Sequence, residues 1–149
     1  MNRIKTYVMA ATALLTAVSC DSYKDSENPD KLVEADKNLS GVWQLTGVKR
    51  NDIDISTAMD FTSFKLHLEE SGRYSLENRL PFPVSEAGFW EVDNPEYPFQ
   101  LTFTEDGVAG EAEEVEIRYP IVDGKRQLCI THSPGCELNS YEYTFVKIN

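Results

Sequence analysis

Leu39-Ser40-Gly41-Val42-Trp43-Gln44-Leu45-Thr46-Gly47-Val48 is the first stretch of the chain in which apolar and polar side chains alternate. Alternate side chains of an extended strand point to the same face, so Trp43, Leu45 and Gly47 share one face and the intervening polar residues share the other. One face of this segment therefore needs a hydrophobic core. We predict that it is the opening strand of an antiparallel sheet, and that residues 39–149 form one folded domain.

The same alternation recurs along the rest of the chain, in segments bounded by Gly, Pro, Asn or Asp residues. The predicted strands cover 62–70, 73–80, 88–92, 99–103, 115–121, 128–130 and 140–148. No amphipathic helical pattern is long enough to cover a sheet, and closing the sheet on itself is the natural way to remove its edges. We therefore predict an all-β fold, an antiparallel up-and-down meander of about eight strands closed into a barrel, with a β-sandwich as the alternative.

The opening Gly41-Val42-Trp43 followed by this meander resembles the lipocalin-like lipoproteins of Gram-negative bacteria, over roughly residues 39–149. The interior of an eight-stranded barrel is either filled by side chains or just wide enough for one small ligand. Six aromatic residues on the predicted inward phases are the candidate ligand-binding residues. They are Trp43, Tyr74, Trp90, Phe103, Tyr119 and Tyr143.

The first nineteen residues have the layout of a signal peptide, because Arg3 and Lys5 precede the apolar run 7–18. This run is shorter than the roughly 20 apolar residues that span a bilayer. Ala17-Val18-Ser19-Cys20 resembles the lipobox of bacterial lipoproteins, which implies that Cys20 carries fatty acyl chains such as palmitate; plain secretion is the alternative. Residues 20–38 are then the lipidated cysteine and an acidic tether. The predicted location is the cell envelope, at the outer membrane, on either the periplasmic face or the cell surface.

The formal net charge of −11 bears on the partners of the chain. An acidic surface repels nucleic acid and anionic lipid, so we expect neither as a partner. We expect a monomer that contacts the membrane through the anchor at Cys20 and binds either a small apolar ligand or an envelope protein.

Cys129 and Cys136 bracket a predicted hairpin connection. In the oxidising envelope we expect them to form a disulfide that holds this loop. A metal site made by Cys129, His132 and Cys136 is the alternative, although it lacks an obvious fourth ligand.

The sequence contains none of the motifs that assemble an activated nucleophile or a phosphate loop. His67 and His132 are its only histidines, and His67 falls on the polar phase of its strand. Glu111, Glu113, Glu114 and Glu116 could pair for glycoside hydrolysis, but consecutive glutamates are more typical of a solvated surface. We therefore expect no catalytic residue, no metal and no cofactor, with a hydrolase as the least favoured function.

Two other functions remain open. A carrier of a small apolar or amphipathic molecule needs a cavity near Trp43 and Trp90, whereas a protein-interaction module needs a filled barrel and an exposed apolar patch. If a pocket exists, it should open at one barrel end, with the loop 81–87 as its rim. The remaining aromatic residues near loops either cap the core or are exposed: Phe82, Phe89 and Phe99.

Overall fold

The computed structural model describes residues 35–58, 60–107, 112–135 and 138–148. The predicted signal peptide, Cys20 and most of the predicted tether lie outside this range. Within it, no helix is long and apolar enough to span a membrane. Its strands are β1 (Gly41–Arg50), β2 (Ile53–Asp54), β3 (Lys65–Leu68), β4 (Arg73–Glu77), β5 (Gly88–Val92), β6 (Gln100–Glu105), β7 (Ala112–Arg118), β8 (Ile121–Val122), β9 (Lys125–His132) and β10 (Tyr141–Lys147).

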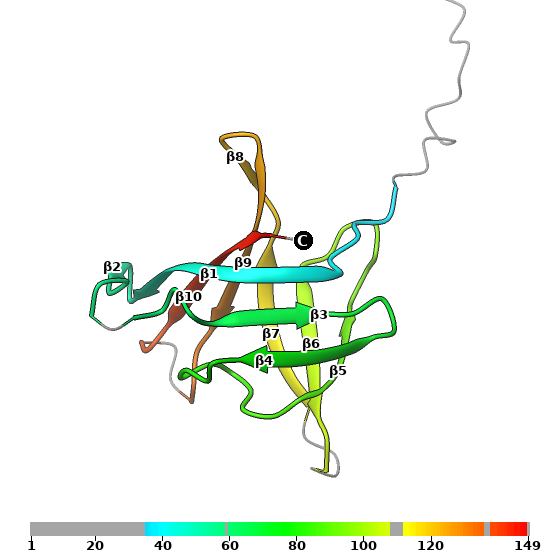
Figure 1. The fold of residues 1–149 in the computed structure, drawn as a ribbon, viewed down its shortest axis with the longest axis horizontal. Helices are drawn as coiled ribbons and strands as arrows, with labels where there is room; N and C mark the ends of the chain where they lie inside the picture. Colours follow the sequence, from blue (N-terminus) through cyan, green and yellow to red (C-terminus); the bar gives the residue numbers. More distant parts are fainter. Residues whose placement is uncertain (1–34, 59, 108–111, 136–137, 149) are drawn as a thin grey trace, which may run out of the picture. The chain divides into compact units, whose positions relative to one another are not determined.

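The strands form a closed antiparallel barrel (Figure 1). Neighbours around it follow the order β10, β1, β3, β4, β5, β6, β7, β9, and the pairing of β9 with β10 closes the ring. The short strands β2 and β8 pair outside the ring, with β1 and β9. The predicted eight-stranded barrel is confirmed. The alternative of a β-sandwich is wrong, because β10 is hydrogen-bonded to both of its neighbours and the sheet has no break.

Large apolar side chains fill the barrel interior. The largest of those that are fully buried are Trp43, Tyr74, Phe64, Phe103 and Phe145. Each lies at a position of its strand whose side chain points into the barrel, or in the turn just before β3. Side chains packed this closely leave little free volume inside the barrel. The barrel is therefore a packed core over most of its length.

The opening strand departs from the predicted alternation at one point. A register shift lies between Leu45 and Gly47 where β1 pairs with β10, so Thr46 has no partner residue and the phase changes. Val48, with 2% of its surface exposed, then faces the core in place of the predicted Gly47. Such a bulge bends the strand, and it lies where β1 passes from pairing with β3 to pairing with β2.

Three predicted strands were too long. The segment predicted over 62–70 forms only the short strand β3, Lys65–Leu68. The strand predicted over 73–80 ends at Glu77, because Asn78 adopts a φ of 59° and turns the chain. The strand predicted over 115–121 ends at Arg118, and Ile121 is 61% exposed on the β8–β9 hairpin instead of pointing inward. This hairpin projects from the barrel (Figure 1).

The barrel has two ends, which the pairing register defines. At the tether end the chain enters through residues 35–40, β1 begins and β10 ends, with the Ile148 amide bonded to the Val42 carbonyl at 2.9 Å. At the opposite end, the mouth, β1 meets β2, and the loop 78–87 connects β4 to β5.

Candidate binding sites at the barrel mouth and on its side

The mouth is closed by the loop 78–87, which we call the mouth loop. Pro81 and Pro83 flank Phe82, and proline has no backbone N–H to donate to a sheet. This explains why the segment leaves the ladder after β4 and lies across the opening. Leu80 and Phe82 pack against the core, and Val84 is 4% exposed. The loop therefore turns every second side chain into the barrel.

The Phe82 ring occupies a pocket made of other aromatic rings. Its centroid lies 5.3 Å from that of Phe64 and 5.3 Å from that of Tyr143. It lies 6.0 Å from Phe103 and 6.1 Å from Phe145. These distances are typical of aromatic pairs, and the four partners come from different parts of the chain. We call this pocket the aromatic nest.

A few hydrogen bonds hold the mouth loop in place. The Tyr143 hydroxyl donates to the Pro81 carbonyl at 2.9 Å. The Glu105 carboxylate accepts the backbone N–H groups of Ser85 and Glu86. These two N–H groups lower the pKa of Glu105. The loop is thus latched at Pro81 and at Ser85, on either side of Phe82.

Two cavities flank the Phe82 segment. An apolar one of about 190 Å³ is lined by Val48, Ile55, Ala58, Phe61, Pro81, Tyr141 and Tyr143. A second one, of about 240 Å³, is lined by Phe82, Pro83, Val84, Ser85, Phe103, Glu105 and Glu113. Ligand pockets usually hold about 300–1,000 Å³, and each cavity alone falls short of that range. Pro81 borders the first cavity, and Phe82 and Pro83 border the second, so the mouth loop contributes to the walls of both.

The core beside the nest holds a polar atom that has no partner. Tyr74 is 1% exposed, and its ring packs edge-on against Phe103 with centroids 4.8 Å apart. Its hydroxyl oxygen has no hydrogen-bond partner among the described residues. Burial raises the pKa of this phenol. A buried hydroxyl without a partner is costly, and Tyr74 itself borders neither of the two mouth cavities.

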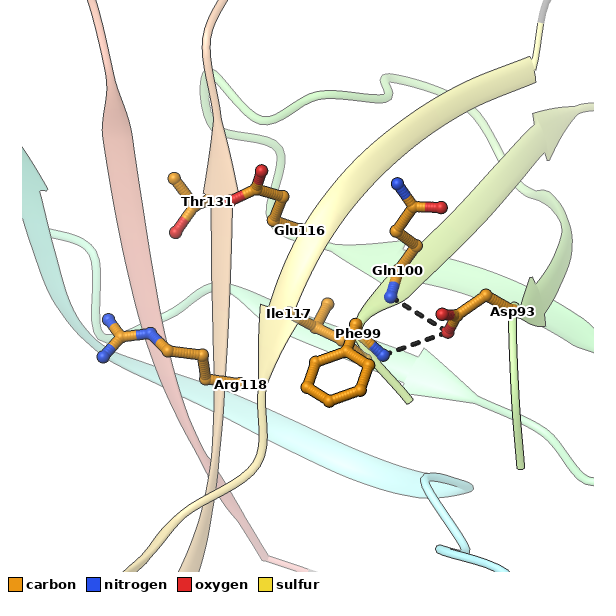
Figure 2. A pocket seen from close by; sticks show the side chains of 7 residues that line it. All are labelled: Asp93, Phe99, Gln100, Glu116, Ile117, Arg118 and Thr131. Carbon is orange, nitrogen blue, oxygen red and sulfur yellow. Dashed lines mark hydrogen bonds between the residues drawn. The ribbon is translucent and has the colours of Figure 1, made fainter. Parts of the chain in front are cut away.

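A larger pocket lies on the outside of the barrel, across β6, β7 and β9. We call it the side pocket, of about 530 Å³ (Figure 2). It is lined by Asp93, Phe99, Gln100, Glu116, Ile117, Arg118 and Thr131. The Phe99 ring is 67% exposed and stands in the middle of this group (Figure 2).

Hydrogen bonds fix the polar groups at the edges of the side pocket. The Asp93 carboxylate accepts the backbone N–H groups of Gln100 and Phe99, each at 3.0 Å, and these bonds lower its pKa. Arg118 is turned toward β10, where it pairs with Glu142. Glu142 also binds Lys49 at 3.1 Å. One carboxylate is therefore shared by two cations, Lys49 and Arg118.

The six aromatic residues that were predicted from the sequence to bind a ligand fall into two groups. Tyr143 and Phe103 border the mouth cavities. The other four line none of the pockets described here: Trp43, Tyr74, Trp90 and Tyr119. Trp43 and Tyr74 fill the core, while Trp90 and Tyr119 are partly buried against it. The predicted rim loop is present, and of the loop aromatics Phe82 caps the core while Phe89 and Phe99 are exposed.

The glutamates of β7 separate according to strand phase. Glu114 and Glu116 are exposed, as expected of a solvated surface. Glu113 is in phase with the buried Val115 and borders the second mouth cavity, and its carboxylate lies 3.0 Å from His132. The Glu113 side chain is nevertheless 40% exposed, so its carboxylate stays in contact with solvent at the edge of that cavity. Glu111 lies outside the described residues.

Cys129 is 7% exposed and forms no disulfide with another described residue, and burial raises the pKa of its thiol. Cys136 lies outside the described residues, so their disulfide stays a prediction. Residues three apart on a strand face opposite sides, so Cys129 and His132 do not converge as the alternative metal site requires. His67 lies on the outer face, as predicted, with its Nε2 3.3 Å from Glu77.

Comparison with known proteins places most of the chain in one family. Residues 21–146 match the model of a domain of unknown function, DUF5004, and the chain belongs to that family. No curated protein and no solved structure matches it.

Proposed function

We propose that this DUF5004 chain is a non-catalytic lipoprotein of the Gram-negative cell envelope. In this proposal Cys20 carries the lipid anchor, and the barrel binds a small apolar or amphipathic ligand at its mouth. The ligand takes the place of the Phe82 ring in the aromatic nest. The anchor and the location rest on the lipobox resemblance, and the ligand site rests on the mouth.

One observation carries the ligand site: an aromatic side chain from a loop fills a pocket of aromatic rings that lies between two cavities. In this proposal the Phe82 ring occupies the space that the ligand would fill. Its displacement costs the Tyr143 bond to Pro81 and the ring contacts, and the ligand replaces those contacts.

The lining indicates the ligand class. The nest and the first cavity are apolar, which suits a hydrocarbon or aromatic body. The Glu105 and Glu113 carboxylates provide polar groups in the second cavity, which Phe82 also borders. A molecule with one apolar body and a hydrogen-bonding end fits this distribution.

Fluorescence titration with N-phenyl-1-naphthylamine, an apolar probe, tests the site. We expect the wild type to bind the probe, and Phe82→Ala to bind it at least tenfold more tightly because the competing ring is gone. Phe82→Trp, with a larger plug, should bind it more weakly than the wild type. Phe89→Ala is the matched control, because it removes a phenylalanine that is 53% exposed on the outside of β5.

Equal probe affinities of Phe82→Ala and Phe89→Ala would contradict the mouth site. Binding by Phe82→Ala alone, with none by the wild type, would mean only that the substitution creates a cavity.

A second candidate is a protein-interaction module, favoured by the filled interior and by the exposed Phe99 in the side pocket. Phe99→Ser would then abolish a stable complex with an envelope protein, whereas Phe82→Ala would leave that complex intact. Size-exclusion chromatography of the purified pair measures this loss.

A further inference from the structure

We infer that the tether end of the barrel rests on a phospholipid surface, so that the mouth faces away from the membrane. This inference rests on the proposed anchor at Cys20, but not on the proposed ligand site. It concerns how the anchored domain is oriented.

Three contacts gather separate segments around the point where the chain enters the barrel. The Lys37 amide bonds to the Pro95 carbonyl at 2.7 Å, which brings the β5–β6 loop to this point. The Tyr119 hydroxyl donates to the Asn38 carbonyl at 3.2 Å, at the base of the β8–β9 hairpin. The Ile148 amide bonds to Val42 beside them. The loop, the hairpin and the end of β10 therefore surround residues 37–42.

Each of these three segments exposes a large apolar side chain. Tyr97 is 51% exposed on the loop, Ile121 and Val122 are 61% and 41% exposed on the hairpin, and Ile148 is 47% exposed after β10. A single exposed apolar residue needs no explanation, but their collection around the entry of the tether does. Aromatic and aliphatic side chains of this kind insert into the interfacial region of a bilayer.

Cations accompany these apolar side chains. Lys125 and Arg126 belong to the hairpin, where the Arg126 guanidinium lies 4.6 Å from the Tyr119 ring centroid. Lys147 ends β10. Lys and Arg beside apolar residues are typical of membrane-contacting surfaces, because their long stems cover apolar surface while the charge reaches lipid phosphates.

Carboxylates lie at both ends of the barrel. The mouth and its loops carry Asp52, Asp54, Asp60, Glu86, Glu105, Asp106 and Glu113, together with the cations Arg50 and Arg79. The tether end carries Asp36, Glu69, Glu70, Asp93, Glu96 and Asp123, so its attraction to anionic lipid is weak. We therefore expect the insertion of apolar side chains, and not charge, to decide which end contacts the bilayer.

The length of chain before the barrel is sufficient for the tether end to reach the bilayer. Residues 21–34, fourteen in number, separate Cys20 from Ala35. Fully extended they reach at most about 50 Å, so an anchor at Cys20 keeps the tether end within that distance of the bilayer.

The test compares an environment-sensitive dye at Ile121→Cys with the same dye at Ile53→Cys. Ile53 is the matched control, because it is 68% exposed on β2 at the mouth. The acylated full chain, with Cys129 and Cys136 replaced by serine, is reconstituted in 3:1 phosphatidylethanolamine–phosphatidylglycerol vesicles. We expect the dye at 121 to shift its emission to the blue by 10 nm or more and to lose at least half its intensity when brominated lipid is added. The dye at 53 should do neither.

Equal quenching at both positions, or none at 121, would overturn the inference while leaving the anchor and the mouth site in place. A chain isolated from its own envelope with no acyl group on Cys20 by intact mass would overturn the inference together with its premise.

Discussion

The two ends of the barrel are closed in different ways. At the tether end the Trp43 indole is fully buried, donates to the Leu39 carbonyl at 2.8 Å and packs edge-on against Tyr119. At the mouth the closing ring, Phe82, comes from a loop between two prolines, of which Pro81 borders one cavity and Pro83 the other. The first closure is made by a strand of the barrel. The second is made by a loop, and it is this ring that we propose a ligand replaces.

The largest effect should come from the tether end. Trp43→Ala removes the indole and its hydrogen bond, and we expect the free energy of unfolding to fall by about 3–5 kcal/mol. Ile53→Ala, at an exposed position, should change it by less than about 0.5 kcal/mol. Urea unfolding monitored by circular dichroism measures both. An unchanged midpoint for Trp43→Ala would contradict the role of Trp43 in the core.

A somewhat smaller effect is expected at the rim of the mouth, where β5 begins. A Cβ at Gly88 would overlap the carbonyl oxygen of Thr104 on β6. Gly88→Ala must shift backbone, at about 1–3 kcal/mol or more. Gly107→Ala is the control, because its Cβ meets nothing within 4 Å and only its φ of 81° opposes the change. If Gly88→Ala destabilises less than this control, the close contact between β5 and β6 is wrong.

The smallest effect concerns the latch of the mouth loop. Tyr143→Phe removes the hydrogen bond to Pro81 and should cost about 1 kcal/mol at pH 7. Burial raises the pKa of Tyr143 to about 12, above its value of about 10 in an unfolded chain. The folded state therefore holds this proton more tightly. The resulting stability is complete below pH 10 and is lost as the pH rises to 12.

Tyr143→Phe should accordingly lose less stability than the wild type between about pH 10 and pH 12, measured by thermal unfolding across that range. Identical pH profiles of the two proteins would show that the phenol is not buried in the folded state. The probe affinity of this variant should rise, because the loop is no longer latched at Pro81.

The ring strands could be predicted because their signals are local. Alternation and turn residues mark each of them, and closure follows from the lack of helices to cover a sheet. The bulge at Thr46 could not be predicted in this way, since it depends on how β1 pairs with β10. The exposed β8 continues the alternation of β7, but Pro120 lies between them and interrupts the ladder.

The mouth was predicted only in part. The sequence identified the loop and named Phe82, but the nest is built by residues distant in sequence, whose positions depend on the closed ring. The sequence did contain a signal that this loop packs against the core. Every second residue in it is apolar: Leu80, Phe82 and Val84. Glu113 likewise lies two residues before the buried Val115 on β7, so both side chains are on the same face of the strand. This spacing could have predicted that Glu113 lies at the mouth.

Native mass spectrometry of the full chain, released from its own envelope without denaturation, detects a ligand held at the mouth. We expect a reproducible extra mass that disappears on unfolding and is reduced in Phe82→Trp, whose larger ring competes better for the nest. A bare monomer mass for both the wild type and Phe82→Ala would contradict the mouth site and favour a barrel that acts through its outer surface.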